Sequence, residues 1–195
     1  MSKVHLNTRS SMLTSRAFPD IPLLAECRDY SVPLLYRNVK FRAYGRECTM
    51  RRSQALFGPV GTKYTFSGVT FDALPMNADL TRLLTLVNRM FPGMGANAIL
   101  VNEYANGEEY ISQHSDDEKE LTPSGVVTIS LGAQRTFRIK DKKTKVTVKD
   151  VPLRSGEVVC MSGVNFQREF THGIPKQLRV KEPRWSFTLR RHATK

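Results

Sequence analysis

The sequence has few cysteines, no long apolar run and no internal repeat. Three cysteines occur among 195 residues and none belongs to a Cys-x-x-Cys pair, so a disulfide framework and a cysteine-built zinc site are excluded. The richest apolar stretch, residues 126–131, is far shorter than the roughly 20 residues that a membrane-spanning helix requires. These features suit a reducing compartment, and we expect a nuclear or cytoplasmic location because no secretion signal is recognised.

Acidic residues are scarce relative to basic ones. The 18 Asp and Glu residues face 30 Lys and Arg residues, and the net charge of +12 favours a polyanionic partner such as nucleic acid. A soluble basic protein without such a partner is the alternative. The length fits one domain, placed at residues 31–195, and residues 1–30 are expected to be a disordered tail or extension. Residues 1–16 also suit an organelle transit peptide. We expect a monomer that binds no membrane.

Short strands dominate the expected secondary structure. One helix is predicted at residues 77–91, where apolar residues recur at three- and four-residue spacing before a Pro-Gly pair. Strands are predicted at residues 39–44, 63–71, 98–104, 126–131, 137–139, 146–151, 157–161, 166–171 and 185–189. The pattern therefore predicts a mainly β protein with flanking helices, folded as a two-sheet sandwich or jelly roll.

A basic stretch with interleaved aromatic residues precedes the predicted helix. Arginine neutralises phosphate while an aromatic ring stacks on a base, so this mixture favours nucleic-acid binding. A solvated hairpin with basic decoration is the alternative interpretation. The residues are Arg37, Lys40, Arg42, Arg46, Arg51 and Arg52, interleaved with Tyr36, Phe41, Tyr44 and Phe57.

Two histidines and one aspartate form a candidate metal site. His114 and Asp116 are two residues apart, so both side chains project from the same face of an extended strand. With His172 they make the two-histidine, one-carboxylate set that holds iron(II) and leaves positions open for a co-substrate and oxygen. A His-x-Asp pair alone also arises by chance, and a lone histidine is more often structural.

Residues 184–190 alternate polar and apolar side chains along a predicted strand. Arg184, Ser186, Thr188 and Arg190 then face one way, and the apolar residues between them face the other. Arginines turned into a sandwich interior require anions, because a buried unpaired charge is costly. A small dicarboxylate meets this requirement, since a guanidinium grips a carboxylate with two parallel hydrogen bonds. An edge strand with its arginines in water is the alternative.

Together these motifs resemble the AlkB family of iron(II)- and 2-oxoglutarate-dependent dioxygenases, whose core is a double-stranded β-helix, or jelly roll. The similarity runs from about residue 41 to residue 190. Ser186 departs from it, because many members have asparagine there and a serine is similar to some plant RNA virus members. The motifs are Asn102-Glu103-Tyr104 for Asn-x-Tyr, His114-Ser115-Asp116-Asp117-Glu118 for His-x-Asp-x-Glu, Thr171-His172-Gly173-Ile174-Pro175 for the last iron ligand, and the closing residues 184–190.

The resemblance implies roles for individual residues. The iron ligands would be His114, Asp116 and His172. The 2-oxoglutarate pocket would comprise Asn102, Tyr104, Arg184, Ser186, Thr188 and Arg190. A basic nucleotide-recognition region would lie at about residues 37–72. In it, the base stack would be probed by Tyr44, Gly45 and Arg46, and the base pocket would be lined by Tyr64 and Phe66. A cationic methylated base would be attracted by Asp117 and Glu118.

The implied activity is oxidative demethylation of N-alkylated bases, of the 1-methyladenine and 3-methylcytosine type, in DNA. Formaldehyde would be released while 2-oxoglutarate and oxygen are converted to succinate and carbon dioxide, with no catalytic side chain beyond the metal ligands. The alternatives are the same chemistry on RNA, hydroxylation of a protein side chain, and a nucleic-acid-binding jelly roll without turnover. The last alternative gives no reason for the histidines, aspartate and arginine strand to occur together.

Overall fold

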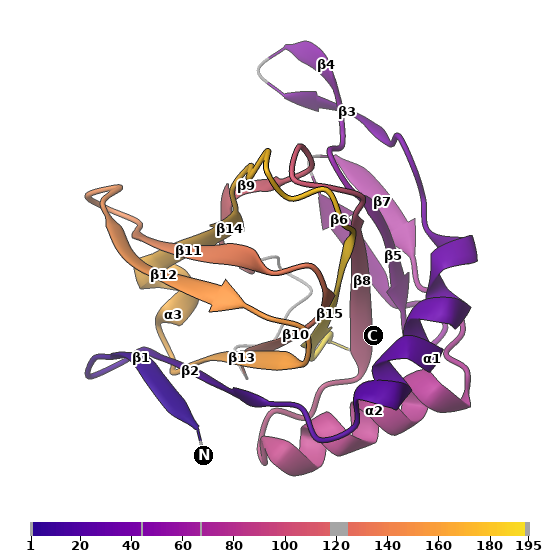
Figure 1. Ribbon diagram of the computed structural model, residues 1–195, viewed down its shortest axis with the longest axis horizontal. Helices are drawn as coiled ribbons and strands as arrows, with labels where there is room; N and C mark the ends of the chain where they lie inside the picture. The colour runs from indigo at the N-terminus through magenta and orange to yellow at the C-terminus, as the bar shows by residue number, and fades with distance from the viewer. Residues whose placement is uncertain (1, 44, 67, 118–124, 194–195) are drawn as a thin grey trace.

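The computed structural model describes residues 2–43, 45–66, 68–117 and 125–193, which form two main antiparallel β-sheets (Figure 1). The larger sheet has the spatial order β1 (Lys3–Asn7), β2 (Met12–Ala17), β13 (Glu157–Ser162), β10 (Val126–Gly132), β15 (Arg184–Arg190), β8 (Ala98–Tyr104) and β5 (Ser53–Phe57). The smaller sheet has the order β12 (Thr147–Leu153), β11 (Arg135–Asp141), β14 (Phe170–Ile174) and β9 (Ile111–His114). The predicted mainly β jelly-roll core is confirmed.

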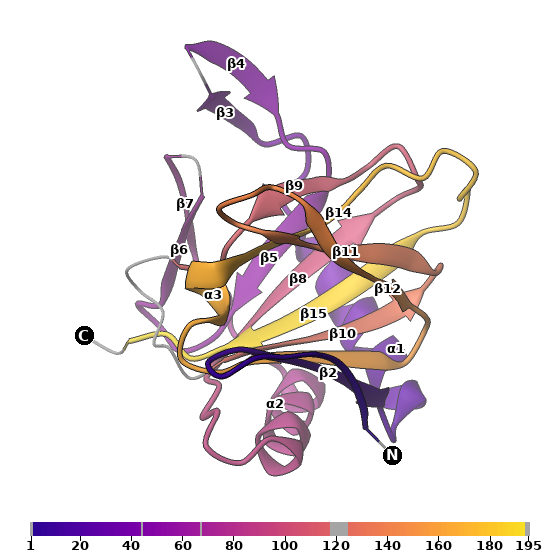
Figure 2. The same ribbon diagram turned by 90° about the vertical axis from the view of Figure 1, so that its left-hand side faces the viewer.

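The smaller sheet lies over one face of the larger sheet (Figure 2). Phe137, Ile139 and Val151 of the smaller sheet pack in one buried cluster with residues of the larger sheet, among them Val159 and Met161. Phe137, Ile139 and Val151 alternate along their strands with more exposed residues, whereas β13 is buried on both faces from Val158 to Met161. The buried side chains between the two sheets therefore hold the sheets at a fixed separation.

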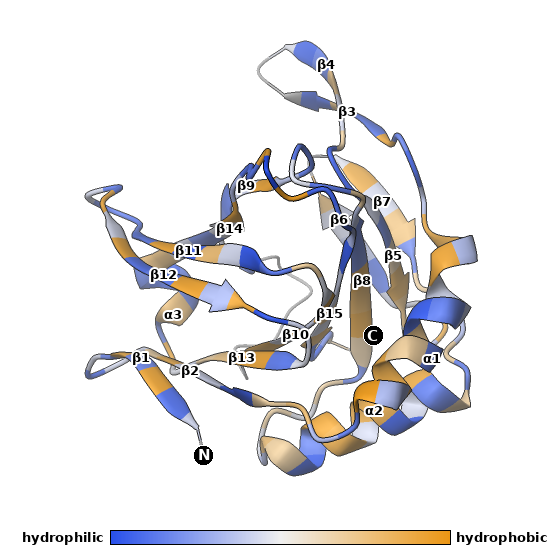
Figure 3. Ribbon diagram, in the orientation of Figure 1, coloured by the Kyte–Doolittle hydropathy of each residue, from blue (hydrophilic) through white to orange (hydrophobic). Residues whose placement is uncertain are grey.

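Two helices cover the opposite face of the larger sheet (Figure 1): α1 (Ile21–Ser31) and α2 (Ala78–Met90). The prediction for α2 is confirmed, and the Asn77 side chain caps the helix by accepting a hydrogen bond from the Leu80 N–H at 2.9 Å. Leu80, Leu83 and Val87 are fully buried on one helix face. Figure 3 shows hydrophobic residues of both helices beside those of β5 and β8. Within the described residues, no helix is both long enough and apolar enough to cross a membrane.

Two hairpins border the open end of the sandwich. The first, β3 (Lys40–Ala43) with β4 (Arg46–Thr49), extends away from the sheets in Figure 1. The second pairs β6 (Lys63–Phe66) with β7 (Val69–Asp72), where the sequence predicted a single strand at residues 63–71. That prediction is wrong because Gly68, with φ of +79°, turns the chain back on itself. A short 3₁₀ turn at Val32–Leu34 links α1 to this part of the chain.

The N-terminal residues, expected from the sequence to be a tail or an extension, form β1, β2 and α1. Strand β2 pairs with β13 from Met12 to Ala17, and its Leu13 and Ser15 side chains are buried. The excess of hydroxyls suggested a solvated tail, but threonine and serine also fit a sheet whose partner strand supplies the hydrogen bonds. A second correction concerns residues 166–171, predicted as one strand, which begin with the short helix α3 (Phe166–Glu169).

Candidate metal centre and adjoining pocket

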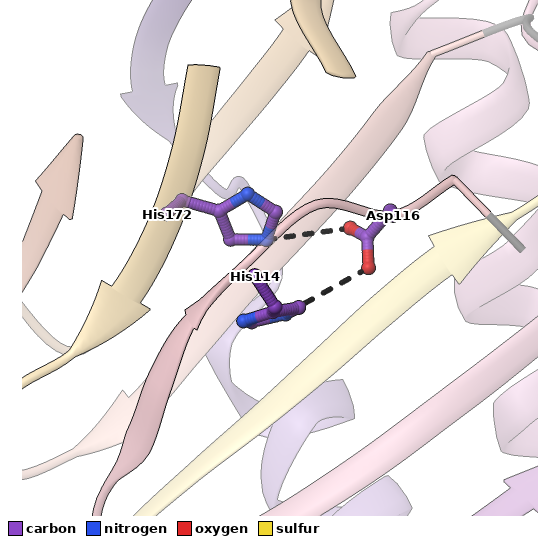
Figure 4. A group of neighbouring side chains, drawn as sticks. All are labelled: His114, Asp116 and His172. Atoms are coloured by element: carbon purple, nitrogen blue, oxygen red, sulfur yellow. Dashed lines mark ion pairs between the residues drawn. The ribbon is translucent and has the colours of Figure 1, made fainter. Parts of the chain in front are cut away.

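Two imidazoles and one carboxylate converge between the sheets (Figure 4). His114 ends β9 and His172 lies directly opposite on β14, so the strand register places both rings on the same face, with centroids 4.4 Å apart. Asp116 follows two residues beyond β9. The Nε2 atom of His172 lies 3.4 Å from Asp116 Oδ2, and the Nε2 atom of His114 lies 3.9 Å from Asp116 Oδ1. The candidate ligand atoms all lie within 4.8 Å of one another.

The electrostatic surroundings keep His114 and Asp116 in the protonation states that bind metal. Burial, and after it the neighbouring His172, lower the pKa of His114 to about 3, so His114 is neutral at neutral pH. The His114 Nδ1 lies 2.9 Å from the Ser112 carbonyl oxygen, which fixes the tautomer and leaves Nε2 for a ligand. Burial opposes ionisation of Asp116, but the Arg190 guanidinium, which donates a hydrogen bond to Oδ1, holds its pKa well below the usual range.

The donor set fits a divalent transition metal. Two imidazole nitrogens and one carboxylate on one side of the centre match the facial arrangement typical of non-haem iron(II). The buried Asp116 Oδ2 has no hydrogen-bond donor among the described residues, so it is available to a cation. The neutral His114 imidazole and the ionised Asp116 carboxylate need lose no proton when a metal binds.

Arg184 is suited to bind a carboxylate. Its side chain is 1% exposed on β15, and Nη2 donates to the Ser130 hydroxyl at 2.8 Å. The Nε and Nη1 atoms have no hydrogen-bond acceptor within the described part of the chain. Burial lowers the pKa of Arg184 to about 10, which leaves it charged at neutral pH. A buried, charged guanidinium with donors still open is suited to hydrogen-bond a carboxylate.

The predicted alternation of β15 is confirmed. Trp185, Phe187 and Leu189 pack toward the helices, whereas the intervening polar side chains turn toward the smaller sheet. A cavity there joins the metal-centre residues to Arg184. Its lining contains every residue that the sequence implied for the metal and 2-oxoglutarate: Asn102, Tyr104, His114, Asp116, His172, Arg184, Ser186, Thr188 and Arg190.

An open groove of about 500 Å³ continues from the His114 side of the centre. Phe41 and Phe66 contribute aromatic rings to its lining, and Tyr110, just before β9, also lines it. Arg52 also lines this groove but is only 4% exposed, because its Nε donates to Asn102 Oδ1 at 2.8 Å and its guanidinium lies 5.3 Å from the Phe66 ring centre. The sequence placed Arg52 in a basic stretch favouring nucleic-acid binding and missed Tyr110, which no local pattern distinguishes.

The residues implied for nucleic-acid contact are divided between the cavity, the groove and the first hairpin. Tyr64 lines the cavity and Phe66 lines the groove. Gly45 turns the β3–β4 hairpin with φ of +76°, and Arg46 is exposed on β4. Asp117 is partly exposed and forms an ion pair with Lys142, at 2.9 Å. Two further residues of this set, Tyr44 and Glu118, lie outside the described residues.

Arg135 is a buried residue near the site that the sequence did not indicate. Its guanidinium is 5.7 Å from the Tyr104 ring centre, and the Arg184 guanidinium is 5.3 Å from the same ring. Arg135 donates to the carbonyl oxygens of Asn106, Glu109 and Pro175 at 2.8 to 2.9 Å. It therefore ties together two loops behind the cavity. Its acceptors are backbone atoms, so no residue type in the sequence marks them.

Comparisons with known proteins agree with this geometry. The family model of the 2OG-Fe(II) oxygenase superfamily matches residues 25–190. DNA oxidative demethylase ALKBH2 of Homo sapiens is 33% identical over 160 residues, which cover 78% of this chain and 60% of that protein. Alpha-ketoglutarate-dependent dioxygenase alkB homolog 3 of Homo sapiens is 33% identical over 138 residues, covering 65% of this chain and 47% of that protein. The chain thus spans only part of the length of these relatives.

A solved structure supports the fold. The structure of OsALKBH1 superimposes with a TM-score of 0.62 at 16% identity, covering 97% of this chain and 100% of that one. At this identity the likeness concerns the arrangement of the sheets and helices alone.

Proposed function

Because this chain belongs to the AlkB family within the 2OG-Fe(II) oxygenase superfamily, we propose that it removes alkyl groups oxidatively from the bases of nucleic acid, with DNA as the favoured substrate. The observation that carries the proposal is the continuity of three features at one end of the sandwich. The His114, Asp116 and His172 cluster and the buried Arg184 guanidinium line one cavity, and His114 also lines the groove that contains Arg51, Phe41 and Phe66.

In this proposal His114, Asp116 and His172 hold iron(II), and Arg184 binds the distal carboxylate of 2-oxoglutarate. When bound, the metal and co-substrate supply, with oxygen, the oxidising equivalent that hydroxylates an N-methyl carbon, and formaldehyde, succinate and carbon dioxide leave. The chain's own contribution is placement. Arg184 is anchored by Ser130 and by the Tyr104 ring, so its guanidinium keeps a fixed orientation.

Residues around the groove would place the base. The exposed Arg51 lines it together with Phe41 and Phe66, which combines a cation for phosphate with rings for stacking. A base paired in a duplex must leave the stack to reach the buried centre, and methylation that already blocks pairing lowers that cost of a few kcal/mol. The partly exposed Asp117 adds a carboxylate that would attract a cationic methylated base, in competition with Lys142.

A turnover assay tests the proposal. The purified protein, supplied with iron(II), 2-oxoglutarate and oxygen, is given oligonucleotides containing 1-methyladenine or 3-methylcytosine, and formaldehyde and succinate are measured. We expect both products from the wild-type protein and none from His114→Ala, because that change removes one of the three candidate ligands. Turnover by His114→Ala at the wild-type rate would refute the assignment of the centre.

Substrate class requires a parallel comparison. Methylated single-stranded DNA, duplex DNA and RNA of one sequence are assayed side by side, and we expect the DNA substrates to be turned over faster. Faster turnover of RNA would move the proposal to RNA demethylation. Oligonucleotide binding that does not weaken with salt would contradict phosphate contacts and favour a protein substrate. Absence of iron-dependent 2-oxoglutarate consumption would favour a binding module.

A further inference from the structure

The three candidate ligands are positioned by different kinds of contact. His114 and His172 belong to paired strands, so the hydrogen-bond ladder of the smaller sheet sets their separation. Asp116 lies beyond the end of β9 and belongs to no strand. Arg190 holds one oxygen of its carboxylate, and the position of its backbone depends on the contacts made between the end of β9 and Asp117.

The side chain of Gln167 holds that backbone. Gln167, on helix α3, accepts a hydrogen bond from the Asp116 N–H to its Oε1 atom at 2.9 Å. Because a backbone N–H can only donate, the carbonyl end of the amide must face Asp116. The amide nitrogen fits this orientation, since Gln167 Nε2 lies 3.9 Å from the Met161 sulfur, a weak acceptor. The Ser115 hydroxyl adds a contact to the Phe170 carbonyl oxygen at 3.1 Å, just beyond α3.

Helix α3 is itself anchored from two sides. Glu169 accepts hydrogen bonds from the hydroxyls of Ser10 and Ser11, at 2.6 and 2.5 Å, in the loop between β1 and β2. On the other side the Lys142 N–H donates to the Glu169 carbonyl oxygen at 2.8 Å, and Lys142 Nζ lies 3.2 Å from the Gln167 carbonyl oxygen. A helix of one turn is not stable alone, so these contacts are what fix its position.

We propose that Gln167 is a positioning residue for the metal centre. It sets the distance between the Asp116 carboxylate and the two imidazoles by fixing the Asp116 backbone, and it touches neither metal nor substrate. This inference rests on the assignment of His114, Asp116 and His172 as ligands in the proposed function. Residues that orient metal ligands contribute about 10- to 100-fold to metal affinity or activity in other proteins.

The test measures Mn²⁺ binding to the otherwise intact protein, by titration with detection of free Mn²⁺ by electron paramagnetic resonance. Gln167→Met keeps the length of the side chain but removes the acceptor, and Gln167→Glu restores an acceptor. Gln177→Met is the matched control, because Gln177 Oε1 also accepts a backbone N–H, that of Thr136 at 2.7 Å, in a half-buried position outside the cavity lining. His114→Ala removes a ligand outright.

We expect Gln167→Met to raise the Mn²⁺ dissociation constant about 10-fold, Gln167→Glu to stay within about 3-fold of wild type, and Gln177→Met to match wild type. The two methionine variants should lose similar thermal stability without metal, since each removes one hydrogen bond of the same kind. The inference would be overturned if Gln167→Met bound Mn²⁺ with wild-type affinity, or if Gln177→Met or Gln167→Glu lost as much affinity as Gln167→Met. In either case a loss of Mn²⁺ binding in His114→Ala would still support the metal centre. Equal Mn²⁺ binding by wild type and His114→Ala would overturn both this inference and the assignment of the centre.

Discussion

Replacing Arg135 by methionine should destabilise the fold by about 3 to 4 kcal/mol. Arg135 is 1% exposed, and its guanidinium donates to three carbonyl oxygens, those of Asn106, Glu109 and Pro175. These acceptors belong to two loops, which are also joined by backbone hydrogen bonds of Gly107 with Gln177 and Val180. Methionine fills most of the same space but leaves all three oxygens without the donor.

The magnitude follows from those three bonds. A hydrogen bond from a charged donor contributes about 1.5 kcal/mol at the lower end of its range, and three of them contribute roughly 4 to 5 kcal/mol. These values already include the desolvation of the guanidinium, and burial of the apolar methionine side chain recovers about 1 kcal/mol. For a chain of this length each kcal/mol lowers the melting temperature by about 2 to 4 °C, so a loss of roughly 6 to 16 °C is expected.

The assay is equilibrium unfolding by denaturant, followed by circular dichroism, for Arg135→Met beside Arg138→Met. Arg138 lies on the same strand but pairs only with the half-exposed Asp150, so its replacement should cost at most about 1 kcal/mol. Arg135→Lys, which keeps the charge but not the planar fork, should fall between the two. Equal losses in Arg135→Met and Arg138→Met would refute the role given to the buried guanidinium.

Three further predictions concern other parts of the molecule. Gly107→Ala should lower the free energy of unfolding by about 1 to 3 kcal/mol, because an added Cβ would lie 1.8 Å from the Gln177 carbonyl oxygen. An unchanged denaturation midpoint would contradict this packing. Arg184→Ala should raise the half-saturating 2-oxoglutarate concentration far more than that of the oligonucleotide, whereas equal increases would contradict a carboxylate role. Burial raises the pKa of the Cys27 thiol to about 12 from 9.0, so the folded protein keeps a proton that the unfolded chain releases. Stability should therefore fall as pH rises from 9 to 12, by up to about 1.4 kcal/mol per pH unit from this thiol, and Cys27→Ala should flatten that decline in unfolding experiments.

Elements with strong local patterns were predictable from the sequence. Helix α2 has a continuous apolar stripe, a capping asparagine and a Pro-Gly stop, and its observed bounds differ from the prediction by one residue at each end. Strand β8 was predicted with the observed bounds, since it is a run of mainly apolar residues that ends before a turn. Helix α1 was missed because its apolar residues are interrupted by charges and follow Pro22 near its start.

The candidate site was predictable where residue type and spacing carry the chemistry. The histidines, the aspartate and the arginine strand have such patterns, and the structure brings them into one cavity. Arg135 and Gln167 were not identified, because each acts on backbone atoms of segments distant in the sequence. A backbone carbonyl or N–H is the same in every residue, so only the folded arrangement shows which one is the partner.

The pairing of β2 with β13 has a consequence for how the chain acquires its structure. Residues 12–17 leave the ribosome long before residues 157–162, yet the two segments share one ladder. The sheet thus closes only after most of the polypeptide exists, and such high contact order slows folding. Until then β2 has an open edge that attracts other unfolded chains. We therefore expect yield in expression to depend on chaperones and growth temperature more than the stability of the finished protein would indicate.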